Sequence, residues 1–363
     1  MNRIGERLSA FLSTASPCLA KMGRMRQLLV RLMSMALIAL GSTSAITVAQ
    51  DSARTQFVAP PKRAHHALVY DAQRQRVLLT GGNLPIADGK SYTSFNDLWA
   101  FDGVNWAALP SSGLEVWGMQ LAFDSRRRRV LSFGGISNRR AISDVRVLEK
   151  DVWTTLGQHR EMPAAEAGFV YDSRRDRFVA FGGTLGDGSA YGDTWEFAGS
   201  TWSKVTPRSP PARQGHAMVF DERRGRTVIF GGTGPYAENQ PPPRLGDVWE
   251  FDGRRWSARK FANGPGPRTS PGAAYDSKRG VIVIFGGVDG SGFLGDLWAW
   301  NGAEWRKLAD ASSAGPAPRA MGYLAYDQRR DRVVLFGGRK GWPDGDLDDT
   351  WEWDGATWRR IGS

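Results

Sequence analysis

Six pairs of glycines recur along the chain at nearly equal intervals. Successive pairs lie 53, 48, 49, 55 and 51 residues apart. A repeat of this length is typical of a solenoid, a propeller or an array, because each unit needs its neighbours to bury its apolar surface. The pairs are Gly81-Gly82, Gly134-Gly135, Gly182-Gly183, Gly231-Gly232, Gly286-Gly287 and Gly337-Gly338.

Each repeat has the same internal order, which predicts four short strands. An apolar stretch ending in an aromatic residue and Asp, such as "HAMVFD", is followed by a basic turn and by an apolar run into Gly-Gly, such as "RTVIFGG". Asp221 at the start of one turn, with Gly225 four residues on, suits a type I turn with a left-handed residue near its end. A variable loop then leads to Asp-x-Trp and to a second Trp.

The second strand of each repeat is apolar at almost every position, as in "VIVIF", so we expect both of its faces to be covered. Six such sheets close most naturally into an all-β, six-bladed propeller of four-stranded antiparallel blades. Small residues in the first strand place it next to the axis, and the Trp strands then lie outside. The predicted propeller spans 60–362, with blades at about 60–109, 110–156, 157–205, 206–259, 260–308 and 309–362.

Two tryptophans seven residues apart close most repeats, as in "WEWDGATW" from Trp351 to Trp358. A two-residue type I′ turn at Asp354-Gly355 would place these two tryptophans directly opposite each other. We interpret the pairs as packing residues and not as a stack that binds a ligand. Only Trp117 and Trp342 have no place in the repeat.

Residues 1–49 differ from the rest of the chain. Basic residues precede the apolar run "LMSMALIALG", which small residues follow, and this order predicts a cleaved signal peptide, with 50–59 as a linker. The true start could be Met22 or Met25, and the alternative is a membrane anchor. Cleavage would leave 42 basic and 36 acidic residues, a mildly basic protein. We therefore expect a secreted or periplasmic protein with no stable membrane span.

Cysteine and histidine are scarce. The only cysteine is Cys18, which excludes a disulfide framework, and the chain has four histidines. Four histidines are too few to favour a metal site of clustered histidines, so we predict no metal site and no cofactor.

The Gly-Gly pairs, the Asp before the third strand and the aromatic-to-Trp spacing resemble the kelch repeat. The form "HAMVFDERRGRTVIFGG…GDVWEFDG…W" is similar to secreted bacterial kelch proteins grouped with the central domain of galactose oxidase. Copper radical chemistry would need a cysteine-crosslinked tyrosine, which this propeller lacks, and the Ser-x-Asp part of sialidase boxes is missing. The resemblance implies a binding module for a glycan or a protein; the alternative is a carbohydrate-active enzyme such as a sialic acid mutarotase.

Long loops between strands two and three, and between blades, share one face of the predicted ring, which is our candidate binding face. Four arginines occupy equivalent places before the first strand and would form a basic arc that binds an anionic group, or would be a repeated structural device. The candidate ligand-binding residues are Arg63, Arg213, Arg268, Arg319, Trp117, Trp342, Tyr236, His66 and His216. For His66 and His216 the alternative is a satisfied histidine at a strand end.

The opposite face carries six short turns that together hold 17 basic and 9 acidic residues. This charge could attract a polyanion, but no aromatic residue is interleaved for base stacking, so we do not expect nucleic acid as a partner. We predict a monomeric, non-catalytic module and name no catalytic residue.

Overall fold

The computed structural model describes residues 57–86, 91–110, 115–159, 162–205, 209–238, 240–312, 314–342 and 345–362. The chain divides into two units, Met1–Thr55 and Gln56–Ser363. The predicted signal peptide at 1–49 lies outside the described residues, as does most of the predicted linker.

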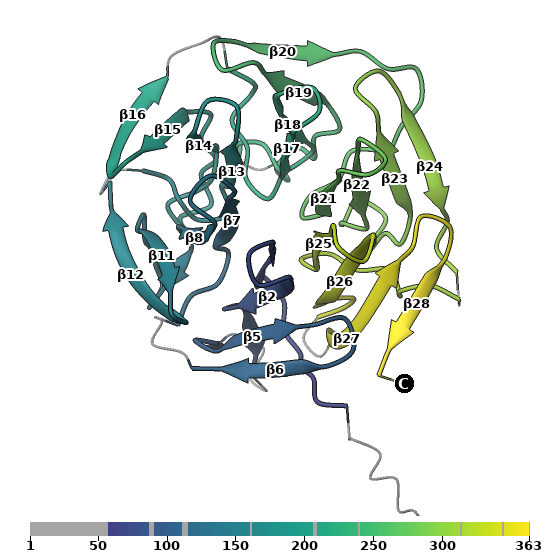
Figure 1. The fold of residues 1–363 in the computed structure, drawn as a ribbon. Helices are drawn as coiled ribbons and strands as arrows, with labels where there is room; N and C mark the ends of the chain where they lie inside the picture. Colours follow the sequence, from purple (N-terminus) through teal and green to yellow (C-terminus); the bar gives the residue numbers. More distant parts are fainter. Residues whose placement is uncertain are drawn as a thin grey trace, which may run out of the picture. The chain divides into compact units, whose positions relative to one another are not determined.

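Residues 57–362 form six four-stranded antiparallel sheets arranged as blades around a central axis (Figure 1). Each blade is one uninterrupted stretch of sequence, which confirms the predicted six-bladed propeller. The first three blades consist of β1 (Ala67–Asp71), β2 (Arg76–Thr80), β5 (Leu98–Phe101) and β6 (Trp106–Leu109); of β7 (Gln120–Asp124), β8 (Arg129–Phe133), β11 (Val145–Glu149) and β12 (Val152–Gly157); and of β13 (Gly168–Asp172), β14 (Arg177–Phe181), β15 (Thr194–Ala198) and β16 (Thr201–Val205).

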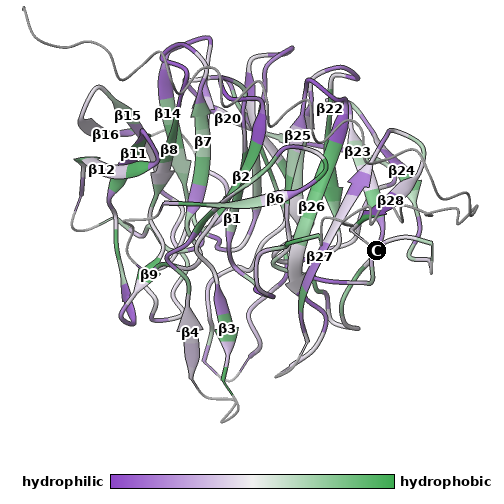
Figure 2. Cartoon of the chain, turned by 60° about the horizontal axis from the view of Figure 1, so that its bottom comes forward, coloured by the Kyte–Doolittle hydropathy of each residue, from purple (hydrophilic) through white to green (hydrophobic). Residues whose placement is uncertain are grey.

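The remaining three blades repeat this order. They consist of β17 (Ala217–Asp221), β18 (Arg226–Phe230), β19 (Val248–Phe251) and β20 (Trp256–Arg259); of β21 (Gly272–Asp276), β22 (Val281–Phe285), β23 (Leu297–Trp300) and β24 (Trp305–Ala309); and of β25 (Tyr323–Asp327), β26 (Arg332–Arg339), β27 (Asp346–Trp353) and β28 (Trp358–Ile361). Two small hairpins extend the loops after the second strands, β3 (Asn83–Pro85) with β4 (Tyr92–Ser94) and β9 (Ile136–Ser137) with β10 (Arg140–Ala141). Figure 2 shows β3 and β4 projecting beyond the blades.

The core lies between blades and not inside any single one. Within the described residues, buried apolar side chains form six clusters, and each cluster joins two neighbouring blades. The first strand of each blade contacts the first strands of both neighbours, so these six strands line the axis, as their small residues predict. The second strands are buried along most of their length, and Figure 2 colours them as mainly hydrophobic.

The turn between the first and second strands has the predicted geometry. Asp71 accepts backbone hydrogen bonds from Gln73 and Arg74, and the fourth loop residue is left-handed, with φ of 55° at Gln75 and 64° at Gly225. Asp at the start and a residue that tolerates positive φ before the second strand are therefore requirements of this turn.

The outer hairpin differs from the prediction. Trp353 and not Trp351 lies opposite Trp358, and Trp351 faces Arg360. The connection is a four-residue loop in which the Asp354 carboxylate accepts hydrogen bonds from the backbone of Ala356 and Thr357. This side-chain acceptor stabilises the longer loop, so the two-residue type I′ turn was wrong.

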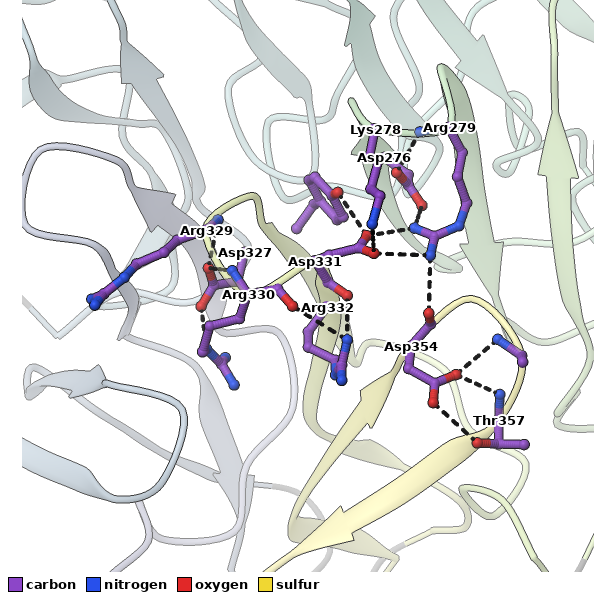
Figure 3. A network of polar contacts seen from close by, with 12 residues as sticks. Asp276, Lys278, Arg279, Asp327, Arg329, Arg330, Asp331, Arg332, Asp354 and Thr357 are labelled. Atoms are coloured by element: carbon purple, nitrogen blue, oxygen red, sulfur yellow. Dashed lines mark hydrogen bonds and ion pairs between the residues drawn. The ribbon is translucent and has the colours of Figure 1, made fainter.

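Charged turns join the blades on the short-turn face. Arg279 binds Asp276 in its own turn, and it also binds Asp331 and the Asp354 carbonyl of the next blade (Figure 3). Arg127 reaches Asp176 in the same way, and Arg174 donates to the carbonyl of Arg223. Many of the basic residues that give this face its charge therefore connect neighbouring blades.

Candidate functional site

A closed ring of backbone hydrogen bonds surrounds the axis on the long-loop face. Its six members occupy equivalent positions, two residues after Arg63 and its counterparts in the other blades, and all are left-handed with φ between 51° and 67°. The N–H of each member donates to the carbonyl oxygen of the member in the preceding blade, over 2.7–3.3 Å. The members are His65, Gly118, Glu166, Gly215, Ser270 and Met321. We call this ring the channel mouth.

A pocket of about 50 Å³ lies at the channel mouth. Polar side chains from all six blades line it, together with small and apolar residues of the first strands. No lysine or arginine is among the lining residues that the structure describes. The polar lining side chains are His65, Gln120, Glu166, His216, Ser270 and Tyr323.

Burial disfavours the charged forms of the titratable groups that line the pocket. Burial, together with the nearby Arg339 charge, lowers the pKa of His65 to about 3, so the imidazole is neutral at pH 7. Burial raises the pKa of Glu166, whose carboxylate lies 3.8 Å from Nδ1 of His65. Burial also raises the pKa of Tyr323, which keeps its phenol protonated. The pocket therefore offers neutral donors and acceptors beside one acidic group.

A row of aromatic rings leads from the rim of the long-loop face to this pocket. Trp342 contacts Tyr92 with ring centroids 5.6 Å apart, Tyr92 stacks on Trp117 at 6.3 Å, and Trp117 meets the His65 ring edge-on at 5.3 Å. Trp342 and Tyr92 are 51% and 44% exposed. We call Trp342, Tyr92 and Trp117 the aromatic row. Large aromatic side chains left exposed and adjacent mark a recognition surface.

The row is held by charged and strand contacts beneath it. The Arg339 guanidinium lies 4.8 Å from the Trp342 ring centroid and forms a bidentate, buried pair with Asp346. Tyr92 is on strand β4 of the first small hairpin, and Trp117 forms a bridge with Ile136 of β9. Blades six, one and two thus each contribute one aromatic ring.

The structure corrects the basic arc. The four predicted arginines are buried, and each forms a bidentate ion pair with the Asp of Asp-x-Trp in its own blade. Each also donates to the first carbonyl of its Gly-Gly pair, as Arg213 does to Gly231 at 3.0 Å. Arg63, Arg213, Arg268 and Arg319 therefore have their guanidinium groups inside the blades, away from any ligand surface.

These arginines are therefore the repeated structural device of the alternative interpretation. Their guanidinium groups bind within their own blade and not to the next one. The side chain binds its own blade, while the backbone N–H and carbonyl at the same position bind the preceding blade, as in Arg213 with Tyr191 and Gly183. The Asp also accepts the indole N–H of the first Trp, at 2.7 Å between Asp247 and Trp249. We call this unit the Arg–Asp–Trp triad.

The two candidate histidines are buried immediately before the first strands of blades one and four. His66 packs edge-on against Tyr323 and Phe336, and His216 packs against Phe181. Within the part of the chain that the structure describes, the ring nitrogens of neither histidine have a hydrogen-bond partner among protein atoms. His216 lines the pocket, whereas His66 does not.

The remaining candidates separate into two places. Trp117 and Trp342 are brought together through Tyr92, whereas Tyr236 lies on the long loop of blade four, 67% exposed and outside the row. Sequence reasoning missed Tyr92, and it did not select His65 or Glu166 as site residues. The signal for His65 and Glu166 was their equivalent position in the repeat, where other blades have Gly, Ser or Met.

Among the described residues, no group of three His, Cys, Asp or Glu side chains is placed to hold a metal ion. None of the described segments forms a helix with the length and hydropathy to cross a membrane.

Six four-stranded antiparallel blades around a polar channel mouth define a kelch-type β-propeller. The model of the KLHDC2/KLHL20/DRC7 Kelch-repeats domain matches residues 173–361, just over half of the chain, and the protein belongs to this family. No curated protein sequence matches the chain. Kelch propellers are generally binding or scaffold modules. The narrower grouping with the galactose oxidase central domain stays a prediction.

Proposed function

We propose that this protein is a non-catalytic binding module that takes a neutral saccharide on its long-loop face. The observation that carries the proposal is the aromatic row, which runs from the rim to the polar pocket. The C–H faces of sugar rings pack well on aromatic rings, and hydroxyl groups suit the neutral donors and acceptors of the pocket. A protein ligand, the other class implied by the kelch resemblance, is an outcome that the test below distinguishes.

The charge of the site supports a neutral ligand over an anionic one. The predicted arginine arc is engaged inside the blades, and Arg339 beneath the row is paired with Asp346. Glu166 is the one carboxyl group among the described residues that line the pocket. An acidic glycan would bring a carboxylate toward this side chain, and no lysine or arginine is among the described residues that line the pocket.

A glycan array probed with residues 50–363 tests the proposal. We expect neutral saccharides among the ligands, and we expect Tyr92→Ala to weaken the best of them at least tenfold by calorimetry. Tyr236→Ala is the matched control, because Tyr236 is an exposed aromatic residue of the same face but outside the row. Binding of acidic peptides alone, or equal losses from both variants, would exclude a saccharide on the row.

We further propose that the module acts outside the cytoplasm, after removal of residues 1–49. The basic, apolar and small-residue segments of the leader support this. Amino-terminal sequencing of protein recovered from the periplasm or the medium should begin near Ile46 or Gln50. A mature chain that starts at Met1 or Met25 would rule out cleavage.

The second candidate function is a sugar mutarotase, favoured by one observation. Glu166 has a raised pKa and lies beside a neutral imidazole at the channel mouth, which is an environment that suits proton transfer. Polarimetry of freshly dissolved glucose and of sialic acid distinguishes the two functions. The binding module predicts the spontaneous rate; an acceleration that Glu166→Gln abolishes would establish the enzyme.

A further inference from the structure

The pocket at the inner end of the aromatic row differs from the row in shape and chemistry. The row is open and apolar, whereas the pocket is recessed between the first strands and the residues before them and is lined by polar groups. At about 50 Å³ it is far below the roughly 300 Å³ at which sites for whole small molecules begin. It can receive hydroxyl groups of a sugar, but not a complete sugar ring.

The aromatic row reaches the axis at the channel mouth. The backbone N–H and carbonyl of all six members bond to one another around the axis, so the mouth is braced from every blade. Behind it, first strands contact their neighbours on both sides. An oligosaccharide that runs along the row toward the axis therefore meets the pocket at the channel mouth.

The pocket still has hydrogen-bonding capacity. His216 has both ring nitrogens without a partner among the described residues and is 9% exposed. The Glu166 carboxylate lies 3.8 Å from Nδ1 of His65, which is too far for a hydrogen bond. Burying such polar groups without a hydrogen-bond partner is unfavourable, so a ligand or a water molecule that bonds to them is stabilising.

We propose that the channel-mouth pocket recognises the terminal unit of the saccharide, so that the protein binds chain ends and not internal stretches. This inference rests on the proposed function, because it assigns the pocket to the same ligand that the aromatic row holds. Glu166 and Gln120 are the specificity-determining residues, from blades three and two. They bind the terminal hydroxyl groups, while the row binds the faces of the following sugar rings.

The test uses linear cello-, malto-, xylo- and chitohexaose, each intact, reduced to the alditol at one end, or O-methylated on the terminal ring at the other. For the hexaose that binds best, we expect one of the two end modifications to lower the affinity at least tenfold in calorimetry. Glu166→Gln and Gln120→Ala should lower the affinity for the intact sugar. In both variants, modification of an end should then reduce the affinity by a smaller factor than in the wild type. Glu115→Gln, an exposed carboxylate near Trp117, is the control and should behave as the wild type.

The outcomes separate this inference from the proposed function. If neither end modification matters while Tyr92→Ala still abolishes binding, the pocket does not recognise a chain end, and saccharide binding on the row stands. If no hexaose binds, both proposals fall. If Glu166→Gln has a lowered melting temperature, Gln120→Ala decides, and an unchanged preference for the intact end in that variant overturns the inference.

Discussion

At the scale of single residues, the Arg–Asp–Trp triad is formed in the four blades that have an arginine before the first strand. The other two blades lack this arginine and use a different cation. Blade three has Ala164 at the arginine position; there Asp193 binds Lys204 instead, and the Trp195 indole N–H has no partner among the described residues. In blade two, Arg146 occupies the first Trp position and binds Asp144. The carboxylate at this position thus has a cation as partner in every blade, but the cation is fully buried in the triads, as Arg213 is, and half-exposed in blade three, as Lys204 is.

The first prediction concerns the charge of one triad. Burial alone would raise the pKa of Asp296, yet hydrogen bonds from Arg268 and Trp298 and the charge of Arg268 lower it overall. Asp296→Asn keeps the shape but leaves Arg268 buried without its counter-ion, so we expect a loss of about 3 kcal/mol in the free energy of unfolding. Asp193→Asn at the same repeat position should cost less than about 1 kcal/mol. Urea denaturation measures both, and equal losses would contradict the triad.

The second prediction is a pH dependence set by the buried histidines. Burial, with help from Arg339 and Arg213 respectively, lowers the pKa of His65 and of His216 to about 3, whereas an unfolded histidine takes up a proton near pH 6.5. Between these values the unfolded state binds more protons, so stability falls as the pH falls. From pH 7 to pH 5 each histidine should cost roughly 2 kcal/mol.

Urea denaturation at pH 7, 6 and 5 checks this dependence. His216→Gln cannot take up the proton, so the variant should lose roughly 2 kcal/mol less than the wild type over the same range. A wild-type stability that is flat between pH 7 and pH 5 would show that these imidazoles are already accessible to protons in the folded state.

At the scale of elements, the two tryptophans of the outer hairpin have different structural roles. Trp256, the second of its pair, is 5% exposed, stacks on Phe251 opposite it and donates its indole N–H to Thr194 of the preceding blade. Trp249, the first, is only partly buried and bonds Asp247. The second tryptophan therefore joins two blades, whereas the first completes a triad within one.

The third prediction follows from this division. Trp256→Ala removes a buried ring between two blades and should cost about 3–5 kcal/mol in the free energy of unfolding. Trp249→Ala should cost clearly less, because part of that ring already contacts water. Chemical denaturation of the two variants gives the comparison. A larger loss for Trp249→Ala would mean that the hairpin register or its packing is different in solution.

At the scale of the whole molecule, the ring closes without exchanging a strand. The first and sixth blades are held by the Trp106 bond to Thr350, by a shared apolar cluster, and by the His65 bond to Met321 that completes the channel mouth. Phe57 packs on Gly362 at the same seam, so the two ends of the propeller lie together. The same kinds of contact that join other blades therefore also close the ring.

The sequence predicted the blades because strand order, Gly-Gly pairs and turn residues are local and recur in register. It misjudged the hairpin loop, since Asp-Gly fits both a two-residue and a four-residue connection. It did not pair Arg213 with Asp247, because the contact spans 34 residues and depends on where two strands begin. Trp117 and Trp342 were found as departures from the repeat, but Tyr92 and Glu166 join them only once the ring brings blades together.

The most direct test of the account is the position of a bound saccharide among the tryptophans. With 5-fluorotryptophan incorporated, fluorine NMR reports on all fifteen indoles, and substitutions of Trp117 and Trp342 assign their two signals. On titration with the best hexaose we predict that these two signals shift, while those of the blade tryptophans, such as Trp256 and Trp300, stay in place. Shifts confined to blade tryptophans, with Trp117 and Trp342 unchanged, would contradict binding at the aromatic row.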